Sequence, residues 1–361
     1  MKIIHCADLH LDSKMESNLP KEKAEERKKE LLQTFSNMVL YAKDNDVKVI
    51  LIAGDLFDTA STQQIRIKKQ VGYVISQNPE ITFLYLRGNH DQNDYFSTME
   101  NKPDNLKGFG TAWTSYTFDN VVITGRELPE KITDSVYNEL ILDKNVVNIV
   151  VLHGQISTYD NKNDAPLINR NKLMNKNIDY LALGHIHSYD EKKLDSRGIW
   201  CYSGCLEGRG FDECGDKGFV LLDIFGNQIE HTFKVFGKRK LQEVAVNLKG
   251  SMRYADILNS IKDAAAGISK DDLVKVVLKG DVSEDTSIDL KAYRQQLEPF
   301  FYFIKVEDQT QIEIDFEKYK NDVSLKGEFV RHVETQNIPQ EEKNKIIMTG
   351  LKALAGQEIE L

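Results

Sequence analysis

Short apolar runs alternate with amphipathic stretches over the first two thirds of the chain. Five of the runs are largely β-branched and have the length of buried strands, at residues 2–7, 48–53, 81–86, 146–152 and 180–183. Residues 20–43 and 61–76 instead repeat apolar positions every three or four residues, which is typical of an amphipathic helix. This alternation predicts an α/β arrangement.

The pattern changes twice further along the chain. Strand-like runs at 200–202, 219–224 and 229–235 follow one another as in a β-meander. Strands are then predicted at 241–248, 273–278, 301–306 and 311–315, and helices at 254–265, 289–297, 327–334 and 340–355. We therefore expect three parts: a first domain over residues 1–236, a small α/β capping domain over 237–320, and a C-terminal helical segment over 321–361.

Composition limits the class of protein. The 361 residues carry 47 Lys and Arg against 56 Asp and Glu, a formal charge of −9, and 41% of them are hydrophobic. Those proportions are ordinary for a globular protein and exclude a disordered or collagen-like chain. The negative charge argues against nucleic-acid binding through a basic coat, so a polyanion would need local basic residues or bound cations.

The N-terminus and the cysteines bear on location. No signal-peptide pattern and no 18-residue apolar window is present, so we expect a cytoplasmic protein that does not enter a membrane. Cys6, Cys201, Cys205 and Cys214 match no paired zinc pattern, which favours reduced thiols. A metal or redox pair of Cys205 with Cys201 or Cys214 is the alternative.

Each of the five strong strands runs into residues that can bind a metal. In open α/β sheets, sites form at the carboxyl ends of the strands, and glycines such as Gly54 and Gly88 permit the sharp turns there. The donors and their neighbours are Asp8, His10, Asp55, Asp58, Asn89, His90, His153, His185 and His187. A single Asp-x-His triplet or one histidine would be a weak signal, but five such segments in order argue against chance.

These residue types predict a pair of metal ions. Carboxylate, amide and imidazole donors suit manganese, iron or zinc. So many donors exceed the needs of one ion, whereas two ions ~3.5–4 Å apart and bridged by a carboxylate would use them all and suit phosphoryl chemistry. Asp55 is the expected bridge because it follows the most apolar strand.

The order of these segments resembles the calcineurin-like metallophosphoesterase superfamily over about residues 1–235. The resemblance implies a four-layer αββα sandwich with a dinuclear centre at the sheet edge. It implies that the first metal is held by Asp8, His10, Asp55 and His187, and the second by Asp55, Asn89, His153 and His185. His90 resembles the histidine that meets the scissile phosphate, and Asp58 the carboxylate that orients it.

The implied reaction is phosphoester hydrolysis with two divalent ions. A hydroxide bridging the ions is expected to attack phosphorus in line. His90 is expected to stabilise the developing charge or protonate the leaving oxygen, with its tautomer held by Asp58. Manganese is the expected ion, with iron or zinc as alternatives.

Two segments resemble the SbcD-type DNA repair exonucleases. They are residues 8–12 and residues 202–213, the latter followed by Lys217-Gly218-Phe219, although Cys205 stands where a serine is usual. The α/β part near residues 240–316 resembles the DNA-facing cap of that group. The resemblance implies DNA as substrate and an SbcC-like coiled-coil ATPase as partner.

Several assignments stay open at this point. Arg209, Lys238, Arg239 and Lys240 are candidates for phosphate contact, or for a structural hydrogen bond at Arg209 and ordinary surface positions at the other three. The last predicted helix has an apolar stripe made of Ile347, Leu351 and Leu354. The stripe is expected to cover the capping domain or the sheet, or to dock on a second copy or on the ATPase. A small nucleotide, a cyclic nucleotide or a phosphoprotein is the alternative substrate, and a metal-binding scaffold subunit is the third interpretation.

Overall fold

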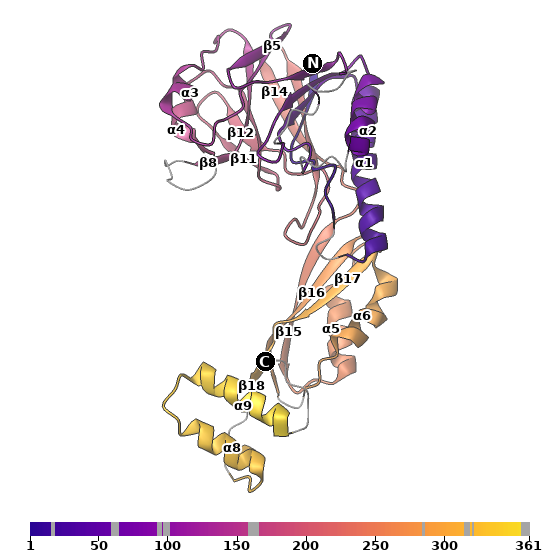
Figure 1. Ribbon diagram of the computed structural model, residues 1–361, viewed down its shortest axis with the longest axis vertical. Helices are drawn as coiled ribbons and strands as arrows, with labels where there is room; N and C mark the ends of the chain where they lie inside the picture. The colour runs from indigo at the N-terminus through magenta and orange to yellow at the C-terminus, as the bar shows by residue number, and fades with distance from the viewer. Residues whose placement is uncertain are drawn as a thin grey trace. The chain divides into compact units, whose positions relative to one another are not determined.

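The computed structural model covers two compact units, Met1–Lys240 and Leu241–Leu361 (Figure 1). The structure describes all residues except 16–18, 59–64, 92–95, 97–101, 158–165, 284–285, 314–317, 320 and 355–361, and the side chain of Lys352. The expected finer division into three parts stays a prediction.

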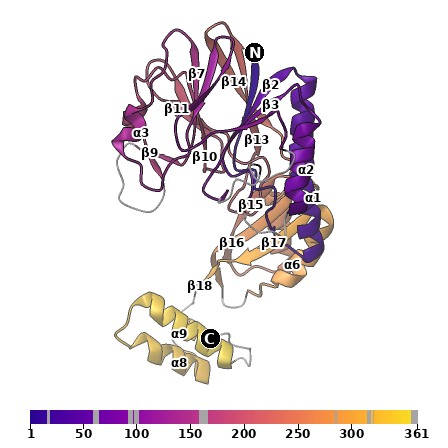
Figure 2. The ribbon, with the colours of Figure 1, turned by 45° about the horizontal axis from the view of Figure 1, so that its top comes forward.

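The first unit contains a six-stranded sheet in the order β14-β13-β1-β2-β3-β4. Its strands are β1 Lys2–Cys6, β2 Val47–Ala53, β3 Thr82–Leu86, β4 Leu106–Gly108, β13 Gly218–Phe225 and β14 Gln228–Val235. β1 to β4 are parallel, and β13 runs antiparallel to its neighbours β1 and β14. The outer face is covered by helices α1 Lys21–Asp44 and α2 Ile65–Ser76 (Figure 2).

A second six-stranded sheet lies opposite the first, in the order β11-β12-β10-β7-β6-β5. Its strands are β5 Thr114–Phe118, β6 Val121–Gly125, β7 Val147–His153, β10 Tyr180–Gly184, β11 Asp190–Lys193 and β12 Ile199–Tyr202. The four inner strands are parallel, and the two edge strands are antiparallel to their neighbours. Outside this sheet lie α3 Asp134–Asn138, α4 Arg170–Leu173 and the two-stranded sheet of β8 Gln155–Ser157 and β9 Leu167–Asn169.

The core of this unit explains why its strands read as continuous apolar runs. One face of the first sheet packs on α1 and α2 through side chains such as Ile50 and Phe35, while Leu51 and Leu84 face the second sheet and meet Ile149. In strands that are buried on both faces, apolar residues do not alternate with polar ones along the sequence. The α/β class is confirmed, and this unit has the expected αββα layers.

The topology brings five strand ends to one edge. β1, β2 and β3 are parallel in one sheet, and β7 and β10 in the other, so their carboxyl ends deliver the following loops to the same region. Contacts between these loops join the sheets: the backbone N–H of His185 donates to the Asp8 carboxylate, at 2.9 and 3.0 Å from its two oxygens.

The second unit holds a parallel sheet in which β16 is central. Its strands are β15 Leu241–Gly250, β16 Leu273–Ser283, β17 Phe303–Asp308 and β18 Gln311–Glu313. Helices α5 Tyr254–Ala264 and α6 Leu290–Leu297 share a core with the sheet, and a 3-10 turn, Glu298–Phe300, follows α6. The predicted strand and helix order of this region is confirmed.

The last two helices pack on one another. α8 Leu325–Glu334 and α9 Gln340–Leu354 bury Ile347 and Leu351 of the predicted stripe against Val330 and Val333. A good part of the stripe is therefore covered by the neighbouring helix, an arrangement that the sequence interpretation did not include.

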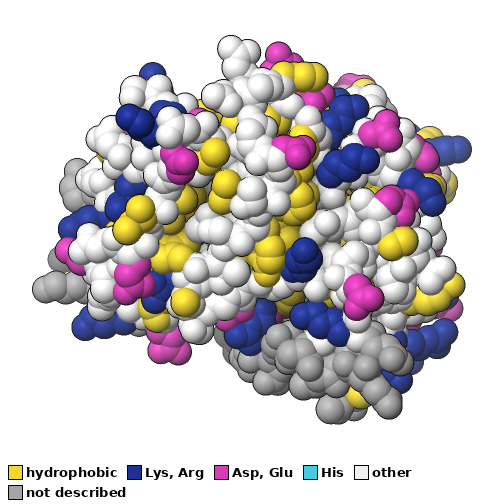
Figure 3. Space-filling view, turned by 90° about the horizontal axis from the view of Figure 1, so that it is seen from above, with side chains coloured by type: hydrophobic (Ala, Val, Ile, Leu, Met, Phe, Trp, Pro, Cys, Tyr) yellow, Lys and Arg dark blue, Asp and Glu magenta, His cyan; other side chains and the backbone are white. Residues whose placement is uncertain are grey.

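The surface carries charges of both signs. On the face seen in Figure 3, Lys and Arg side chains are interspersed with Asp and Glu side chains. Within the described part of the chain, no helix is both long enough and apolar enough to span a membrane.

Candidate metal centre

Asp8 and His10 are held in an unusual backbone conformation directly after β1. Their φ angles are 52° and 40°, in the left-handed region that L-residues seldom adopt. Their backbone N–H groups donate to the carbonyls of Gly54 and Asp55, both at 3.0 Å. The turn after β2 therefore fixes the turn after β1, and both side chains are buried, Asp8 at 1% and His10 at 0% exposure.

Asp55 occupies the turn after β2 and lies between two histidines. Its Oδ2 is 3.3 Å from Nε2 of His153 and 3.9 Å from Nε2 of His10, while its Oδ1 accepts the backbone N–H of His90 at 2.9 Å. One carboxylate oxygen thus faces donors from both sheets, which is the arrangement that a bridging ligand requires.

Glycines make room for these side chains. A Cβ on Gly54, whose φ is +99°, would lie 2.0 Å from Nδ1 of His153. A Cβ on Gly88 would lie 2.1 Å from Oδ1 of Asp55. Both positions exclude any side chain without displacement of a predicted ligand.

Asn89, His153 and His185 meet on the other side of Asp55. The Oδ1 atom of Asn89 is 2.9 Å from Nε2 of His153 and 3.3 Å from Nδ1 of His185. The Nδ1 atom of His153 lies 2.9 Å from the Ala53 carbonyl, which leaves Nε2 facing the cluster. The three residues that the resemblance assigns to a second metal, together with Asp55, are therefore neighbours.

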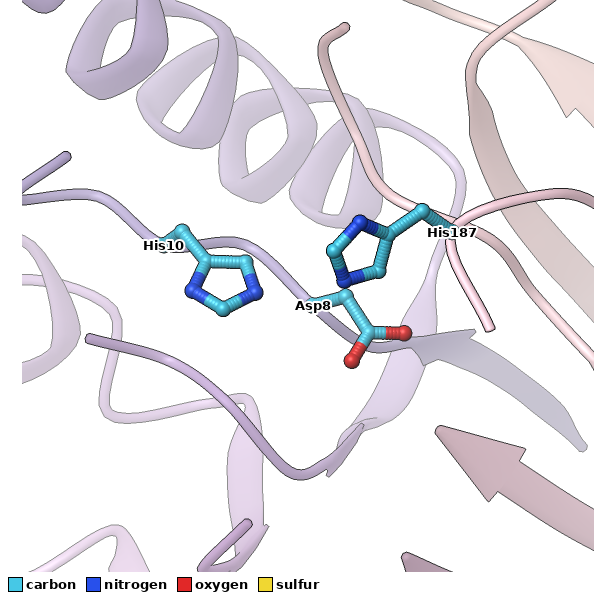
Figure 4. A group of neighbouring side chains, drawn as sticks. All are labelled: Asp8, His10 and His187. Atoms are coloured by element: carbon cyan, nitrogen blue, oxygen red, sulfur yellow. The ribbon is translucent and has the colours of Figure 1, made fainter. Parts of the chain in front are cut away.

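His187 joins the group of Asp8 and His10. One donor atom from each of these three residues lies within 4.8 Å of the others. Figure 4 shows the His187 ring with one nitrogen turned toward Asp8. Two further groups satisfy the same limit: Asp8 with Asp55 and His153, and His10 with Asp58 and His90.

Asp58 connects His10 to His90. Its Oδ1 is 3.2 Å from Nδ1 of His10 and 3.3 Å from Nδ1 of His90. The His90 side chain is 45% exposed, the Asp58 side chain 23% and the His10 side chain 0%. The His90 ring is therefore accessible to solvent, with Asp58 beside one of its nitrogens.

These residues fit divalent metal ions. The Nε2 atom of His10 is buried and has no hydrogen-bond partner among the described residues, which is rare for a buried polar atom. Donors that bind one ion at ~2.1 Å lie at most about 4.2 Å apart, so the observed groupings within 4.8 Å need only small side-chain adjustments. The donor set of carboxylate, amide and imidazole suits manganese, iron or zinc.

The charges of the cluster shift its pKa values. Burial raises the pKa of Asp8, against the pull of His153 and His187. Burial also opposes ionisation of Asp55, but the hydrogen bond and charge of His153 outweigh it and lower the pKa of Asp55. Burial lowers the pKa of His153, but the hydrogen bond and the negative charge of Asp55 outweigh this effect and raise it. A buried acid–base cluster of this kind is typical of functional sites.

Three further acidic residues shape the centre and were missed by the sequence interpretation. Asp91 accepts the backbone N–H groups of Phe57 at 3.0 Å, Gly88 at 3.0 Å and Leu56 at 3.2 Å, so it ties two of the ligand-bearing turns together. Burial raises the pKa of Asp91 to about 6. Asp12 accepts the backbone N–H of Asp58. Both belong to segments that the sequence had marked, Asp91 after His90 and Asp12 after His10, which was the available signal.

The third missed residue is Glu213. Its Oε1 lies 2.6 Å from Nδ1 of His187, and Arg209 donates to it from both its backbone and its guanidinium. Glu213 lies in the segment that resembles the DNA repair nucleases, but nothing in its spacing pointed to His187.

The four basic candidates occupy different places. Arg209 lies beside the centre, with Nη1 3.8 Å from Oδ1 of Asp58. Lys238 and Arg239 pair with Glu30 at 2.7 and 2.9 Å, and Lys240 pairs with Asp216 at 2.6 Å. Their role in phosphate binding stays a prediction, and the charges of Lys238 and Arg239 are already opposed by a carboxylate.

The four cysteines do not form disulfides with one another. Cys6, Cys201 and Cys205 are buried and Cys214 is partly buried, and no disulfide joins them. Burial raises the pKa of Cys201 to about 12, so this thiol is neutral at physiological pH.

The sequence of this chain matches a known protein family and is similar to several known proteins. The model of the family described as calcineurin-like phosphoesterase matches residues 1–189. An uncharacterized metallophosphoesterase of Bacillus subtilis, YhaO, is 25% identical over 342 residues, which cover 87% of this chain and 83% of YhaO. The DNA double-strand break repair protein Mre11 of Methanosarcina acetivorans is 22% identical over 284 residues, 73% of this chain and 43% of that protein. A dimetal phosphatase from Danio rerio aligns with 62% of this chain and 93% of its own, with 11% identity and a TM-score of 0.42. The family match spans more than half of the chain and contains the full set of predicted ligands, so this protein belongs to the calcineurin-like phosphoesterase family.

Proposed function

We propose that this protein is a metal-dependent phosphodiesterase that acts on DNA, with manganese as its ion. The observation that carries the proposal is the convergence of seven potential metal ligands, one of which is Asp55, whose Oδ2 faces Nε2 of both His10 and His153. When bound there, a pair of divalent ions supplies an activated water and charge stabilisation for the phosphoryl oxygens.

The residues of the chain have separable tasks in this proposal. Asp8, His10, Asp55 and His187 would hold one ion, and Asp55, Asn89, His153 and His185 the other. His90 would donate a hydrogen bond to the phosphate or a proton to the leaving oxygen, since its ring is 45% exposed. Asp58, 3.3 Å from Nδ1 of His90, would hold that ring with its other nitrogen toward the substrate.

DNA as substrate is supported by two observations. The segment that resembles the DNA repair nucleases, residues 202–213, contacts the centre through Arg209 and Glu213. In addition, Mre11 of Methanosarcina acetivorans, named as a double-strand break repair protein, aligns with 73% of this chain. The second unit is proposed to face the DNA, and a coiled-coil ATPase is the proposed partner.

A panel of substrates tests the proposal. Purified protein with Mn²⁺ is assayed on linear duplex DNA, single-stranded DNA, bis-para-nitrophenyl phosphate and para-nitrophenyl phosphate, with Asp55→Asn as the inactive control. DNA degradation that is abolished in the control supports the proposal. Hydrolysis of the monoester alone would identify a phosphomonoesterase, and no hydrolysis by protein that has bound metal would identify a scaffold.

A further inference from the structure

The ring of His187 is fixed from outside the metal centre by a carboxylate that no expectation included. Oε1 of Glu213 lies 2.6 Å from Nδ1 of His187, and the Glu213 side chain is only 4% exposed. Because Nδ1 is engaged, the nitrogen that His187 turns toward Asp8 in Figure 4 is Nε2. A histidine whose outer N–H donates to a carboxylate is held in the tautomer and orientation that a metal requires.

Arg209 holds Glu213 in turn. Its backbone N–H donates to Oε2 of Glu213 at 2.7 Å, and its Nη2 donates to Oε1 at 2.8 Å. The same guanidinium lies 3.8 Å from Oδ1 of Asp58 through Nη1. One arginine therefore joins the carboxylate behind His187 to the carboxylate beside His90, two sides of the centre that come from different sheets.

The backbone of His187 is fixed by the same segment of chain. Its carbonyl oxygen accepts the Nζ of Lys217 at 2.8 Å and the backbone N–H of Cys205 at 3.3 Å. Lys217 is 3% exposed, so its ammonium group lies inside the protein, where it donates to this carbonyl. Between these residues, a Cβ on Gly204 would lie 2.9 Å from the backbone nitrogen of Tyr189, which shows how closely the segment approaches.

We propose that Glu213 is a positioning residue for the metal ligand His187, and that Arg209 positions Glu213 rather than contacting the phosphate of the substrate. The proposal rests on the metal centre proposed above. One of its two ions is held through His187, so loss of Glu213 should weaken the binding of that ion and leave the binding of the other unchanged.

Manganese binding tests the proposal independently of turnover. Isothermal titration of the metal-free protein with Mn²⁺ is compared for the wild type, Glu213→Gln and Glu213→Ala. We expect two sites in the wild type and a roughly 10- to 100-fold weaker affinity at one of them in Glu213→Ala, with a smaller loss in Glu213→Gln, which keeps an acceptor for Nδ1. Excess Mn²⁺ should restore turnover of bis-para-nitrophenyl phosphate in both variants.

A matched control comes from a second histidine–carboxylate pair in the same unit. Nε2 of His231 lies 2.6 Å from Oε2 of Glu191, and neither residue belongs to the centre. Glu191→Gln should bind Mn²⁺ as the wild type does.

Three results would overturn the proposal. Two Mn²⁺ sites of wild-type affinity in folded Glu213→Ala would show that His187 needs no such support. A lower melting temperature with unchanged Mn²⁺ affinity would assign Glu213 to folding alone. If Glu213→Ala does not fold, the Mn²⁺ affinity and melting temperature are compared instead for the isosteric variant Glu213→Gln and for Arg209→Gln. A wild-type protein that takes up no Mn²⁺ would remove the metal centre itself, and this outcome is distinct from failure at Glu213.

Discussion

At the residue scale, four of the proposed ligands have a strained backbone. Asp8, Asp55 and His185 have φ angles of 52°, 52° and 100°, and His10 has 40°. Each such conformation costs of order 1–3 kcal/mol and persists only where the surroundings enforce it. Here the enforcing contacts are hydrogen bonds between the turns, such as that from the N–H of His185 to Asp8. The strained turns therefore place the side chains of these four residues close together in the proposed metal centre.

Replacement of Gly54 should disrupt the centre more than it disrupts a turn. Gly54→Ala combines a φ of +99° with a Cβ 2.0 Å from the His153 ring, so we expect a loss of stability beyond the ~1–2 kcal/mol of a left-handed alanine and a weakened second metal site. Gly267→Ala is the control, since Gly267 has a φ of +86° and nothing within 4 Å of the added Cβ. Urea unfolding and Mn²⁺ titration measure both effects. Equal stability losses and unchanged Mn²⁺ binding would contradict this account.

Removal of the His90 ring should separate metal binding from turnover. His90→Ala is expected to keep both Mn²⁺ sites, because His90 is not one of the proposed ligands, and to lower kcat on a phosphodiester by about 100- to 10,000-fold. Steady-state kinetics under saturating Mn²⁺ measure this, with His231→Ala as the control. A near-normal kcat in His90→Ala would rule out its catalytic role.

At the element scale, α1 is joined to distant segments by a buried network of charges. Glu30, 4% exposed, pairs with Arg27 at 2.6 Å, Lys238 at 2.7 Å and Arg239 at 2.9 Å. Arg27 also reaches Glu207 at 3.1 Å. Burial opposes the charge of Glu30, but hydrogen bonds from Arg239, Lys238 and Arg27 outweigh it and lower its pKa to about 2.

This network predicts a pH-dependent contribution to stability. Because the folded-state pKa of Glu30 lies below its ordinary value, the contribution is complete above about pH 4.5 and is lost as the pH falls toward 2. Glu30→Gln should cost about 3–5 kcal/mol at pH 7, and the difference from wild type should shrink below pH 4.5. Urea unfolding at pH 7, 4 and 3 measures it. Glu25→Gln, which removes an exposed pair with Lys28 on the same helix, should change nothing measurable. A difference that is constant with pH would contradict the assignment.

Two of the predicted strands are buried on both faces, and their limits were predicted closely. β2 and β7 are continuous apolar runs, and their predicted limits differ from the observed ones by a single residue. The edge strand β14 was predicted at 229–235, whereas the edge strands β5 and β11 were missed. β11, Asp190–Lys193, consists of four charged residues and is a strand only through its pairing with β12.

The same distinction applies to the candidate centre. The proximity of the proposed ligands could be predicted because each lies at or soon after the end of a recognisable strand, and these strand ends share one sheet edge. Glu213 was not predictable, since its position depends on a segment that returns from β12 to His187, 26 residues earlier in the chain. Lys238 and Arg239 looked available for phosphate in sequence, but their pairing with Glu30 spans 208 and 209 residues. Tertiary contacts of this length leave no local pattern.

At the scale of the whole molecule, the net charge of the protein determines how it can bind DNA. The formal charge is −9, and basic and acidic side chains are interspersed on the face in Figure 3. If two of the acidic residues and their neighbours hold two divalent ions with a bridging hydroxide, the net charge becomes −9 + 4 − 1, or about −6. The protein stays acidic, so attraction to phosphate must be concentrated at the centre.

Metal-free protein should therefore bind DNA weakly. We expect a Kd for a duplex oligonucleotide no tighter than the ~10⁻⁴–10⁻⁶ M of non-specific binders at physiological salt. Fluorescence anisotropy in the presence of a chelator measures it. Nanomolar binding without metal would show a basic surface that this account does not contain.

We propose that the cluster around Asp55 is a two-ion centre that hydrolyses DNA. Its most direct test is the release of nucleotides from linear duplex DNA as the metal-free protein is titrated with Mn²⁺. We predict hydrolysis that reaches its maximum when two ions are bound per chain and that is absent in Asp55→Asn. Intact DNA in the presence of wild-type protein that has bound two Mn²⁺ ions would contradict it.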